Sequence, residues 1–375
     1  MSLAEHDFFK NKKIAVGLSG GVDSSTLISL LKEAGARVMG LTMKLWHDDE
    51  EASTSDKLGI KEACYGPGAK KDLDAIKNLC SQLGAEYKVI DLTREYEEYV
   101  LDYFKKEYLS GHTPNPCVKC NETIKFGFFT QKAKNLGLDF DYFATGHYAR
   151  IEKRNGLSIL RMGADKSKDQ SYFIYRLAPS VLDKTLFPFG EFSKTQVREE
   201  AKRLGLKVAE KAESQDFISG GYDILFGEQK PGDIVDDAGK ILGRHRGIIN
   251  YTIGQRRGIG VSAGPEPVYV SAIDAANNRI IVSPNQKLFC YAILGRDTLI
   301  HDLALDKSGF DAYVRIRQNH KPAKARITVY GEEARIEFAQ AQRAAAPGQS
   351  AVFYDEEGFV LGGCTIALAE PYEAR

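Results

Sequence analysis

A glycine-rich stretch near the start of the chain, Ser19-Gly20-Gly21-Val22-Asp23-Ser24-Ser25, carries residue types suited to binding an anion. It follows an apolar run at residues 14–18, typical of a buried parallel strand, and precedes a helix predicted over residues 24–34. We expect Asp23 and Ser24 to cap that helix. Glycines let backbone N–H groups approach a phosphate, and the helix dipole favours its negative charge. The stretch therefore predicts a phosphate-binding turn between a strand and a helix.

Two common nucleotide-binding loops do not match this turn. No Lys follows the glycines, as the Walker A pattern requires, and no G-x-G-x-x-G is present. The turn therefore belongs to another class of phosphate site, or it is an ordinary glycine-rich turn.

Two cysteines stand close together in Thr113-Pro114-Asn115-Pro116-Cys117-Val118-Lys119-Cys120-Asn121. We expect a helix to begin near Cys120 or Asn121, where its dipole and Lys119 would favour a thiolate. Cys-x-x-Cys spacing fits a redox pair, half of a zinc site, or part of an iron–sulfur site. Because the chain has no second Cys-x-x-Cys, a four-cysteine zinc site is not supported.

The elements that must position these residues alternate between β and α up to about residue 150, which predicts an α/β fold with a doubly wound parallel sheet. Strands are predicted at 14–18, 37–43, 87–91 and 139–145, and helices at 24–34, 69–83 and 95–109. In such sheets ligands bind beyond the carboxyl ends of the strands. Leu18, Met43 and Gly146 all stand at predicted strand ends, so we expect them around one crevice.

The rest of the sequence indicates a hairpin, a helix and two smaller domains. Asn155-Gly156 marks a β-hairpin over residues 150–162, and a helix is predicted near 194–204. Residues 213–285 are rich in glycine and short β runs, and residues 286–375 alternate apolar and polar as in an antiparallel β-barrel. We therefore predict domains at 1–212, 213–285 and 286–375.

Composition sets the broad class. Hydrophobic residues make up 43% of the 375 and charged residues 27%, as in soluble globular proteins. No apolar run is long enough to span a membrane, residues 1–13 lack a signal core, and six cysteines make no disulfide framework. We expect a cytoplasmic protein with no membrane partner.

Charge is balanced over the whole chain, with 51 basic and 51 acidic residues, but not locally. Residues 240–265 contain no acidic residue and five basic ones: Lys240, Arg244, Arg246, Arg256 and Arg257. Such an excess suits a phosphate backbone, although a solvated loop would look the same.

Several motifs resemble those of a known family. The Ser-Gly-Gly-Val-Asp-Ser-Ser stretch is similar to the PP-loop of the ATP pyrophosphatase superfamily, whose enzymes transfer AMP to a substrate oxygen and release pyrophosphate. The Thr-Pro-Asn-Pro stretch with Cys120-Asn121 and Ile124-Lys125-Phe126 resembles the catalytic loop of the tRNA-specific 2-thiouridylases, the MnmA family. Residues 144–149, 168–173, 214–216 and 254–258 resemble further motifs of that family, and the matches run from about residue 13 to 364.

This resemblance implies a tRNA-uridine 2-sulfurtransferase with a PP-loop domain, a small central domain and a C-terminal barrel. In that reaction ATP adenylates O2 of the wobble uridine of a tRNA, and sulfur then displaces AMP to give 2-thiouridine. A urea-like carbonyl oxygen is a very poor leaving group, whereas AMP is a good one. Reading one splayed-out base of an anticodon loop is the expected style of RNA recognition.

Site residues are carried over by position. The implied ATP site comprises Gly17, Leu18, Ser19, Gly20, Gly21, Val22, Asp23, Ser24, Met43 and Gly146, with Asp23 also holding Mg²⁺. The implied contacts to tRNA and its target base are Asn115, Pro116, Cys117, His147, Lys168, Asp169, Gln170, Arg315, Ile316 and Gln349. Cys120 matches the nucleophile, and Cys117 is assigned with it to catalysis.

The chain departs from the family pattern in two ways. Cys117 stands where the best-known members have Asp, and no Cys occurs between Cys120 and Cys290, although members carry a second catalytic Cys shortly after the Ser-x-Asp segment. Either Cys117 and Cys120 act as a thiol pair, or they hold a [4Fe–4S] cluster with Cys64 as a candidate third ligand. The sulfur donor would be a cysteine desulfurase, a sulfur-relay protein or sulfide.

Other interpretations stay open. A small-molecule adenylating ligase of the same superfamily would need neither thiols nor RNA contacts. A tRNA-binding PP-loop protein that has lost thiolation would explain the missing cysteine. For single residues, His147 could simply hydrogen-bond within its own turn, and Cys64 could be a buried loop cysteine.

Overall fold

The computed structural model describes residues 3, 7–46, 63–65, 69–210, 216–218, 223–262, 266–302 and 304–371. The chain divides into two units, one made of Met1–Val100 with Cys117–Gly221, the other of Leu101–Pro116 with Tyr222–Arg375. The predicted boundary at residue 212 lies outside the described residues, and the one between 285 and 286 stays a prediction.

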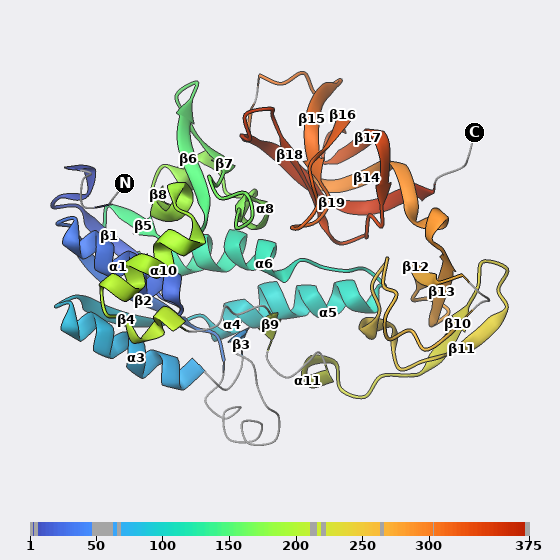
Figure 1. Ribbon diagram of the computed structural model, residues 1–375, viewed down its shortest axis with the longest axis horizontal. Helices are drawn as coiled ribbons and strands as arrows, with labels where there is room; N and C mark the ends of the chain where they lie inside the picture. The colour runs from blue at the N-terminus through green and yellow to red at the C-terminus, as the bar shows by residue number, and fades with distance from the viewer. Residues whose placement is uncertain are drawn as a thin grey trace. The chain divides into compact units, whose positions relative to one another are not determined.

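A five-stranded parallel sheet in the order β4-β2-β1-β5-β8 forms the centre of the first unit (Figure 1). Its strands are β1 (Lys13–Gly17), β2 (Arg37–Lys44), β4 (Glu86–Asp91), β5 (Tyr142–Ala144) and β8 (Thr185–Leu186). The chain builds outward from β1 to β4, then returns to place β5 on the other side of β1. This confirms the doubly wound sheet and puts its switch point between β1 and β5, where ligands bind in such folds.

Both faces of this sheet are covered. On one face, Ile14 and Val16 of β1 pack with α1 (Val22–Glu33), α3 (Ala69–Gln82) and α10 (Lys194–Arg203) in one apolar cluster. On the other, a π-helical stretch, Cys120–Phe128, continues into α7 (Phe129–Asn135). Phe126 and Phe129 of this helix lie 5.6 and 5.7 Å, between ring centroids, from Phe143 of β5.

Smaller elements complete the first unit. The hairpin of β6 (Ala149–Arg154) and β7 (Leu157–Met162) turns at Asn155 and Gly156, both with positive φ, as predicted. Strand β3 (Ala63–Tyr65) runs parallel to β9 (Asp216–Ile218), with Tyr65 opposite Ile218. The short helices are α4 (Thr93–Tyr96), α8 (Ser171–Ile174) and α9 (Pro179–Leu182).

Two predicted helix starts were wrong. Helix α1 is capped by Gly21 without a side-chain hydrogen bond, so Asp23 and Ser24 lie inside its first turn rather than capping it. The cysteine-bearing helix begins earlier than predicted, as α6 (Pro116–Lys119), which puts Cys117 in the first turn and Cys120 at the start of the π-helical stretch. Pro is favoured at the first helical position because its φ is pre-set and the missing N–H would have no partner there.

The second unit contains α5 (Asp102–Leu109), which continues from α4 through a π-helical turn, Glu97–Leu101, and α11 (Asp223–Phe226). A four-stranded sheet has the order β11-β10-β13-β12, and a closed barrel has the order β14-β17-β16-β15-β18-β19. The sheet strands are β10 (Gly232–Val235), β11 (Ile241–His245), β12 (Val268–Asp274) and β13 (Arg279–Pro284). The barrel strands are β14 (Phe289–Ile300), β15 (Phe310–Arg315), β16 (Ala323–Tyr330), β17 (Glu333–Arg343), β18 (Ser350–Tyr354) and β19 (Val360–Pro371). The antiparallel C-terminal barrel is thereby confirmed.

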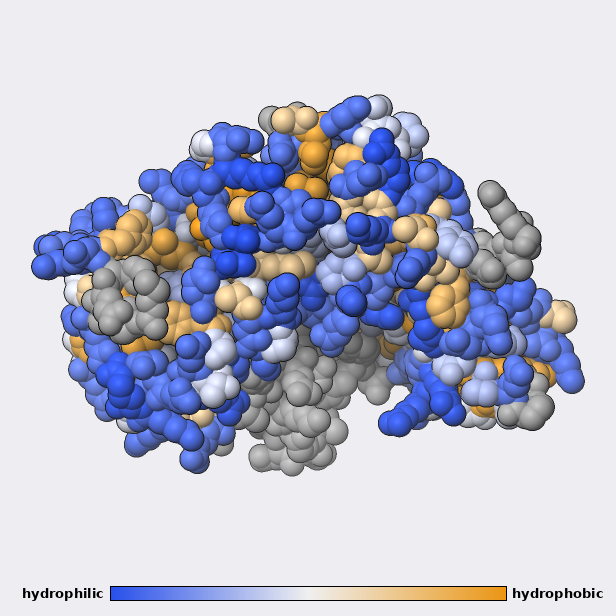
Figure 2. Space-filling model, turned by 45° about the horizontal axis from the view of Figure 1, so that its top comes forward, coloured by the Kyte–Doolittle hydropathy of each residue, from blue (hydrophilic) through white to orange (hydrophobic). Residues whose placement is uncertain are grey.

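The surface is mostly polar on the face shown in Figure 2, where apolar side chains are scattered among hydrophilic ones. Among the described residues, no helix combines the length and apolar character that crossing a bilayer requires.

Candidate active site

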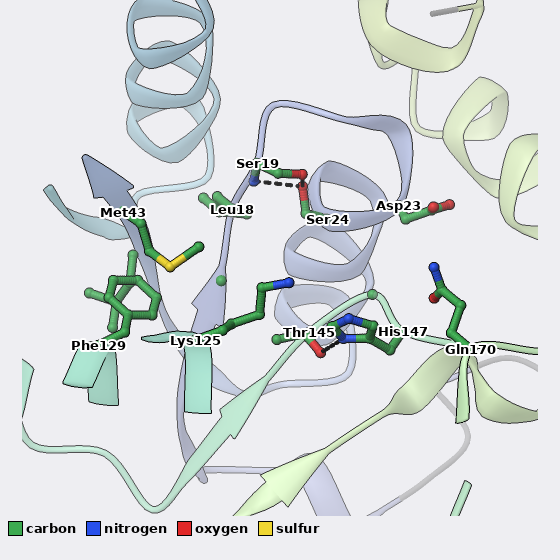
Figure 3. A pocket seen from close by; sticks show the side chains of 13 residues that line it. Leu18, Ser19, Asp23, Ser24, Met43, Lys125, Phe129, Thr145, His147 and Gln170 are labelled. Carbon is green, nitrogen blue, oxygen red and sulfur yellow. Dashed lines mark hydrogen bonds between the residues drawn. The ribbon is translucent and has the colours of Figure 1, made fainter. Parts of the chain in front are cut away.

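A cavity opens at the carboxyl ends of β1, β2 and β5 (Figure 3). Its lining residues are Gly17, Leu18, Ser19, Asp23, Ser24, Leu41, Met43, Lys125, Phe129, Thr145, Gly146, His147 and Gln170. The structure thus brings Leu18, Met43 and Gly146 to one crevice, as the strand pattern predicted. Of the other residues assigned to ATP, Gly20, Gly21 and Val22 belong to the same turn and helix start without lining the cavity.

Hydrogen bonds of Ser24 brace the glycine turn. Its Oγ lies 3.2 Å from the Ser19 backbone N, which donates to it, and 3.3 Å from the Ser19 Oγ. Gly20 has a φ of +75°, a left-handed conformation that favours glycine. Because the first N–H groups of a helix have no intrahelical acceptor, the start of α1 and this turn form an anion-binding concavity.

Gly146 lets the end of β5 come up against the first turn of α1. A Cβ at this position would lie 2.9 Å from the Asp23 Cβ and 3.4 Å from the Ser24 backbone N. A larger residue would therefore push β5 away from the turn, which gives Gly146 a steric reason to be glycine.

Asp23 is held from two distant parts of the chain. The Lys194 Nζ donates to both carboxylate oxygens at 2.7 and 2.8 Å, and the Tyr148 hydroxyl donates to Oδ1 at 2.9 Å. Lys194 is the first residue of α10, whose N-cap Ser193 exchanges hydrogen bonds with Gln196. No local pattern singles out Lys194, because it reaches the turn from 171 residues away.

Lys125 and His147 stand on the side of the cavity formed by the cysteine-bearing helix and the end of β5 (Figure 3). The His147 Nδ1 lies 2.7 Å from the Thr145 Oγ1, so the hydrogen bond within its own turn is present. Burial, together with the neighbouring Lys125 ammonium, holds the pKa of His147 well below its usual value. His147 is therefore neutral near pH 7. The sequence motif contained Lys125 but gave no reason to place it in this cavity.

The five described cysteines fall into two groups. Cys80, Cys290 and Cys364 are buried, and burial raises the pKa of Cys80 and Cys290 to about 11. Cys117 is exposed and Cys120 is half-buried. Separated by three positions on one helix, these two share a face and are the accessible thiols.

The two accessible thiols do not themselves line the cavity, although Lys125 and Phe129 of the same helix do. The side chain of Cys64 lies outside the described residues, as do Ser214 and Gln215. Within the described ranges, no three His, Cys, Asp or Glu side chains group as metal ligands.

Residues 168–170 do not all face the cavity. Gln170 lines the cavity and its Oε1 accepts a hydrogen bond from the Tyr148 N. Asp169 is 1% exposed and accepts hydrogen bonds from the Gly163 N and from the backbone and hydroxyl of Ser171. A tRNA contact through the Asp169 carboxylate stays a prediction. The inward orientation of this carboxylate does not favour such a contact. Lys168, beside it, is half-buried.

The predicted tRNA contacts of the second unit are also mostly buried. Ile316 is 2% exposed and packs in the barrel core. Arg315 is buried, donates to the Gln318 carbonyl and lies over the Tyr354 ring. Asn115 is buried, and Gln349 donates to the carbonyls of Thr113 and Pro114.

The five basic residues between 240 and 265 are all exposed, so they are available to a partner. Their excess is smaller in space than along the chain, because Asp233 of β10 lies opposite Arg244 of β11. These exposed side chains, in β11 and the loops around it, are nevertheless compatible with contact to a nucleic-acid backbone.

A glycine turn between a strand and a helix at the switch point of a parallel sheet, followed by a C-terminal barrel, defines a nucleotide-binding α/β protein with appended β domains. Family models match along the chain: the tRNA methyl transferase HUP domain at residues 12–219, the tRNA methyl transferase PRC-barrel domain at 225–284 and the aminomethyltransferase beta-barrel domain at 299–366.

Curated relatives match over nearly the whole length. The tRNA-specific 2-thiouridylase MnmA of Endomicrobium trichonymphae is 40% identical over 359 residues, covering 94% of this chain and 99% of its own. That of Syntrophotalea carbinolica is 41% identical over 369 residues, with 96% and 99% covered. The chain belongs to the tRNA-specific 2-thiouridylase family.

The neutral His147 predicts a pH dependence of stability. Its pKa in the folded protein lies below the unfolded value of about 6.5, so the unfolded chain binds the extra proton first as the pH falls. The stability that the neutral His147 contributes to the free energy of unfolding is therefore fully present above pH 6.5 and is lost as the pH falls below that value. We expect His147→Gln to flatten the free energy of unfolding between pH 6.5 and 5.5 by up to about 1.4 kcal/mol per pH unit. Urea unfolding at three pH values checks this, and identical slopes for both proteins would contradict it.

Proposed function

We propose that this protein is an ATP-dependent tRNA 2-thiouridylase that converts the wobble uridine of its tRNA to 2-thiouridine. The observation that carries the proposal is its membership, over nearly the whole chain, in a family whose relatives bear that name. The cavity beside the Ser19–Ser24 turn supports the ATP-dependent part, because it joins an anion-binding helix start to apolar walls.

The lining of the cavity favours one orientation of a nucleotide. Met43 and Phe129 lie together at one end in Figure 3 and provide apolar walls for the adenine. The turn with Ser19 and Ser24 stands at the other end, where backbone N–H groups suit phosphates. We propose this orientation for ATP, with Lys125 supplying positive charge between the two ends.

Asp23 is the carboxylate among the cavity-lining residues, and carboxylates are the ligands that Mg²⁺ prefers. It would hold the ion together with phosphate oxygens, where the ion would neutralise phosphate charge. Lys194 is already on this carboxylate. We propose that Lys194 pairs with a phosphate when ATP is bound, which is the part that the Walker A lysine plays in other enzymes.

Replacing Lys194 tests this assignment. We expect Lys194→Met to weaken ATP binding by about tenfold or more, because a phosphate loses its cation and the Asp23 carboxylate loses its counter-charge. Lys202→Met, on the exposed side of the same helix, is the matched control. Calorimetric ATP affinities measure the effect, and equal affinities for the two variants would remove Lys194 from the site.

The chemistry then runs in two displacements. The uridine O2 attacks the α-phosphorus of ATP, the new P–O bond forms, and pyrophosphate leaves with its electron pair. A sulfur nucleophile next attacks C2, and the C2–O2 bond breaks with AMP as the leaving group. The preorganised N–H groups of the turn and the nearby ammonium groups stabilise the charge that develops on phosphate oxygens.

Cys120→Ser separates the two displacements. We expect pyrophosphate release that depends on both ATP and tRNA to persist, while thiolation falls by about a hundredfold or more, because serine cannot carry sulfur. Cys290→Ala, at a buried cysteine, should leave both steps unchanged. The readouts are pyrophosphate release and retardation of thiolated tRNA in a mercury gel.

The rival functions give different results in the same assay. Pyrophosphate release without tRNA would indicate a small-molecule ligase, and tRNA binding without any release would indicate a protein that has lost the reaction. Thiolation surviving in Cys120→Ser would exclude Cys120 as nucleophile or ligand.

Two routes for sulfur are compatible with the accessible thiols. In the thiol route, one cysteine carries a persulfide whose outer sulfur attacks C2; the other thiol then attacks the inner sulfur, the S–S bond breaks, and a Cys117–Cys120 disulfide forms. A reducing thiol from the sulfur donor system must restore the pair. In the cluster route, Cys117, Cys120 and a third cysteine hold [4Fe–4S], which would supply sulfur-binding iron.

The pairing of β3 with β9 supports Cys64 as the third cysteine. Ala63 and Tyr65 lie opposite Asp216 and Ile218, so the backbone at Cys64 runs beside the segment that follows Ser-x-Asp. The family resemblance implies a second catalytic cysteine in that segment. We propose that Cys64, on the neighbouring strand, replaces it.

Iron content decides between the routes. If the cluster is present, protein purified without oxygen will be brown with about four irons per chain, and Cys64→Ala and Cys117→Ala will each lose them. Cys290→Ala should keep them. A colourless, active protein excludes the cluster. Trypsin cuts at Lys119, between the two thiols, so a disulfide joining peptides 107–119 and 120–125 would then identify the thiol route.

A further inference from the structure

The segment that leads into the cysteines, residues 107–116 (the strap), is fastened inside the second unit. At its start, the Arg296 Nη2 of β14 donates to both Glu107 oxygens at 2.9 and 3.0 Å, and the His112 Nδ1 lies 2.9 Å from Glu107 Oε2. Glu107 is buried; against the effect of burial, its bonds to His112 and Arg296 keep the pKa of this carboxyl low. The strap is thus anchored to the barrel by a charged group.

A second anchor grips the strap next to the cysteines. The Thr113 N donates to the Pro347 carbonyl at 2.7 Å, and the Gln349 Nε2 donates to the carbonyls of Thr113 at 2.9 Å and Pro114 at 3.2 Å. Between them, Gly348 has a φ of +91°, and a Cβ there would lie 3.0 Å from the Thr113 carbonyl carbon. The barrel turn at residues 346–349 therefore closes directly onto the strap.

The second anchor lies immediately before the two thiols in the chain. The first segment of the second unit ends at Pro116 and the first unit resumes at Cys117, so the bound residues Thr113 and Pro114 lie just before the thiols. Pro114 and Pro116 have fixed φ and no N–H. A partner of either proline must therefore hydrogen-bond to its carbonyl, and the two prolines make the backbone of this stretch rigid. The strap residues held by Gln349 and Pro347 therefore lead directly into the helix that carries Cys117 and Cys120.

We infer that Gln349 is a positioning residue for sulfur transfer: its carboxamide fixes the strap and thereby the start of the cysteine-bearing helix. The inference deepens the proposed function and rests on it. The two N–H groups of the carboxamide are directed at two strap carbonyls. A direct contact of Gln349 with tRNA, which the family resemblance implies, would have to break these bonds.

Two substitutions of Gln349 distinguish these roles. Gln349→Met keeps the length and removes the donor, and Gln349→Glu places an acceptor against two carbonyls. If Gln349 positions the strap, the thiolation rate at saturating tRNA will fall by about tenfold or more, whereas the tRNA dissociation constant and ATP-dependent pyrophosphate release will change less than about twofold. Gln340→Glu, at an exposed glutamine of the same barrel, should change none of these.

Hydrogen exchange supplies a readout that does not need the reaction. The Thr113 amide, bonded to Pro347, and the amides of residues 118–120 should exchange at least about fivefold faster in both Gln349 variants, with unchanged exchange in the barrel strands. This measurement tests the strap even if the wild-type protein proves not to thiolate tRNA, so failure of this inference and failure of the proposed function are distinguishable.

A substitution at a second position tests the inference independently, in case the Gln349 variants misfold. Gly348→Ala introduces strain and a methyl group facing Thr113. Gly331 also has a positive φ, +64°, but no heavy atom lies within 4 Å of an added Cβ, so Gly331→Ala is the control. Slower thiolation in Gly348→Ala but not in Gly331→Ala supports the inference. Weaker tRNA binding with a normal saturated rate in the Gln349 variants, or unchanged exchange at residues 113 and 118–120, overturns it.

Discussion

The contact of Asp23 with Lys194 and Tyr148 is the interaction on which the candidate site depends most. It joins the first turn of α1, the loop after β5 and the start of α10, three segments that are far apart in the sequence. Charge-assisted hydrogen bonds contribute about 1.5–3 kcal/mol each, less where water reaches them. The Lys194 side chain is 12% exposed and that of Asp23 is 31% exposed, so solvent weakens this pair only in part.

The same contact sets the charge of the cavity. With Asp23 paired to Lys194 and His147 neutral, the Lys125 ammonium and the N–H groups of the turn remain as the positive features facing a ligand. A site prepared in this way attracts a polyanion. The apolar end formed by Met43 and Phe129 gives that polyanion an orientation, as expected for a nucleotide.

Local features of the sequence predicted the fold well, because strand runs, the Asn155-Gly156 turn and the start of α10 depend on neighbouring residues. The glycine turn was also predictable, since it carries its own geometry. Lys194 could not be found this way, because its partner lies 171 residues away. The inward orientation of Asp169 and Ile316 was equally hidden: a motif match tells which residues are shared with a family, but burial depends on the packing of the whole domain.

The π-helical stretch that begins at Cys120 has a consequence for how the thiols and the cavity are linked. A π-turn accommodates about one residue more than an α-turn, so every side chain beyond it is rotated by roughly 100° from where a regular helix would put it. Phe129, which follows this stretch, lines the cavity with this offset in place. The same helix thus carries the two thiols at its start and a cavity-lining residue farther along. The loss of a single residue between them would rotate the thiols relative to the cavity-lining side chain.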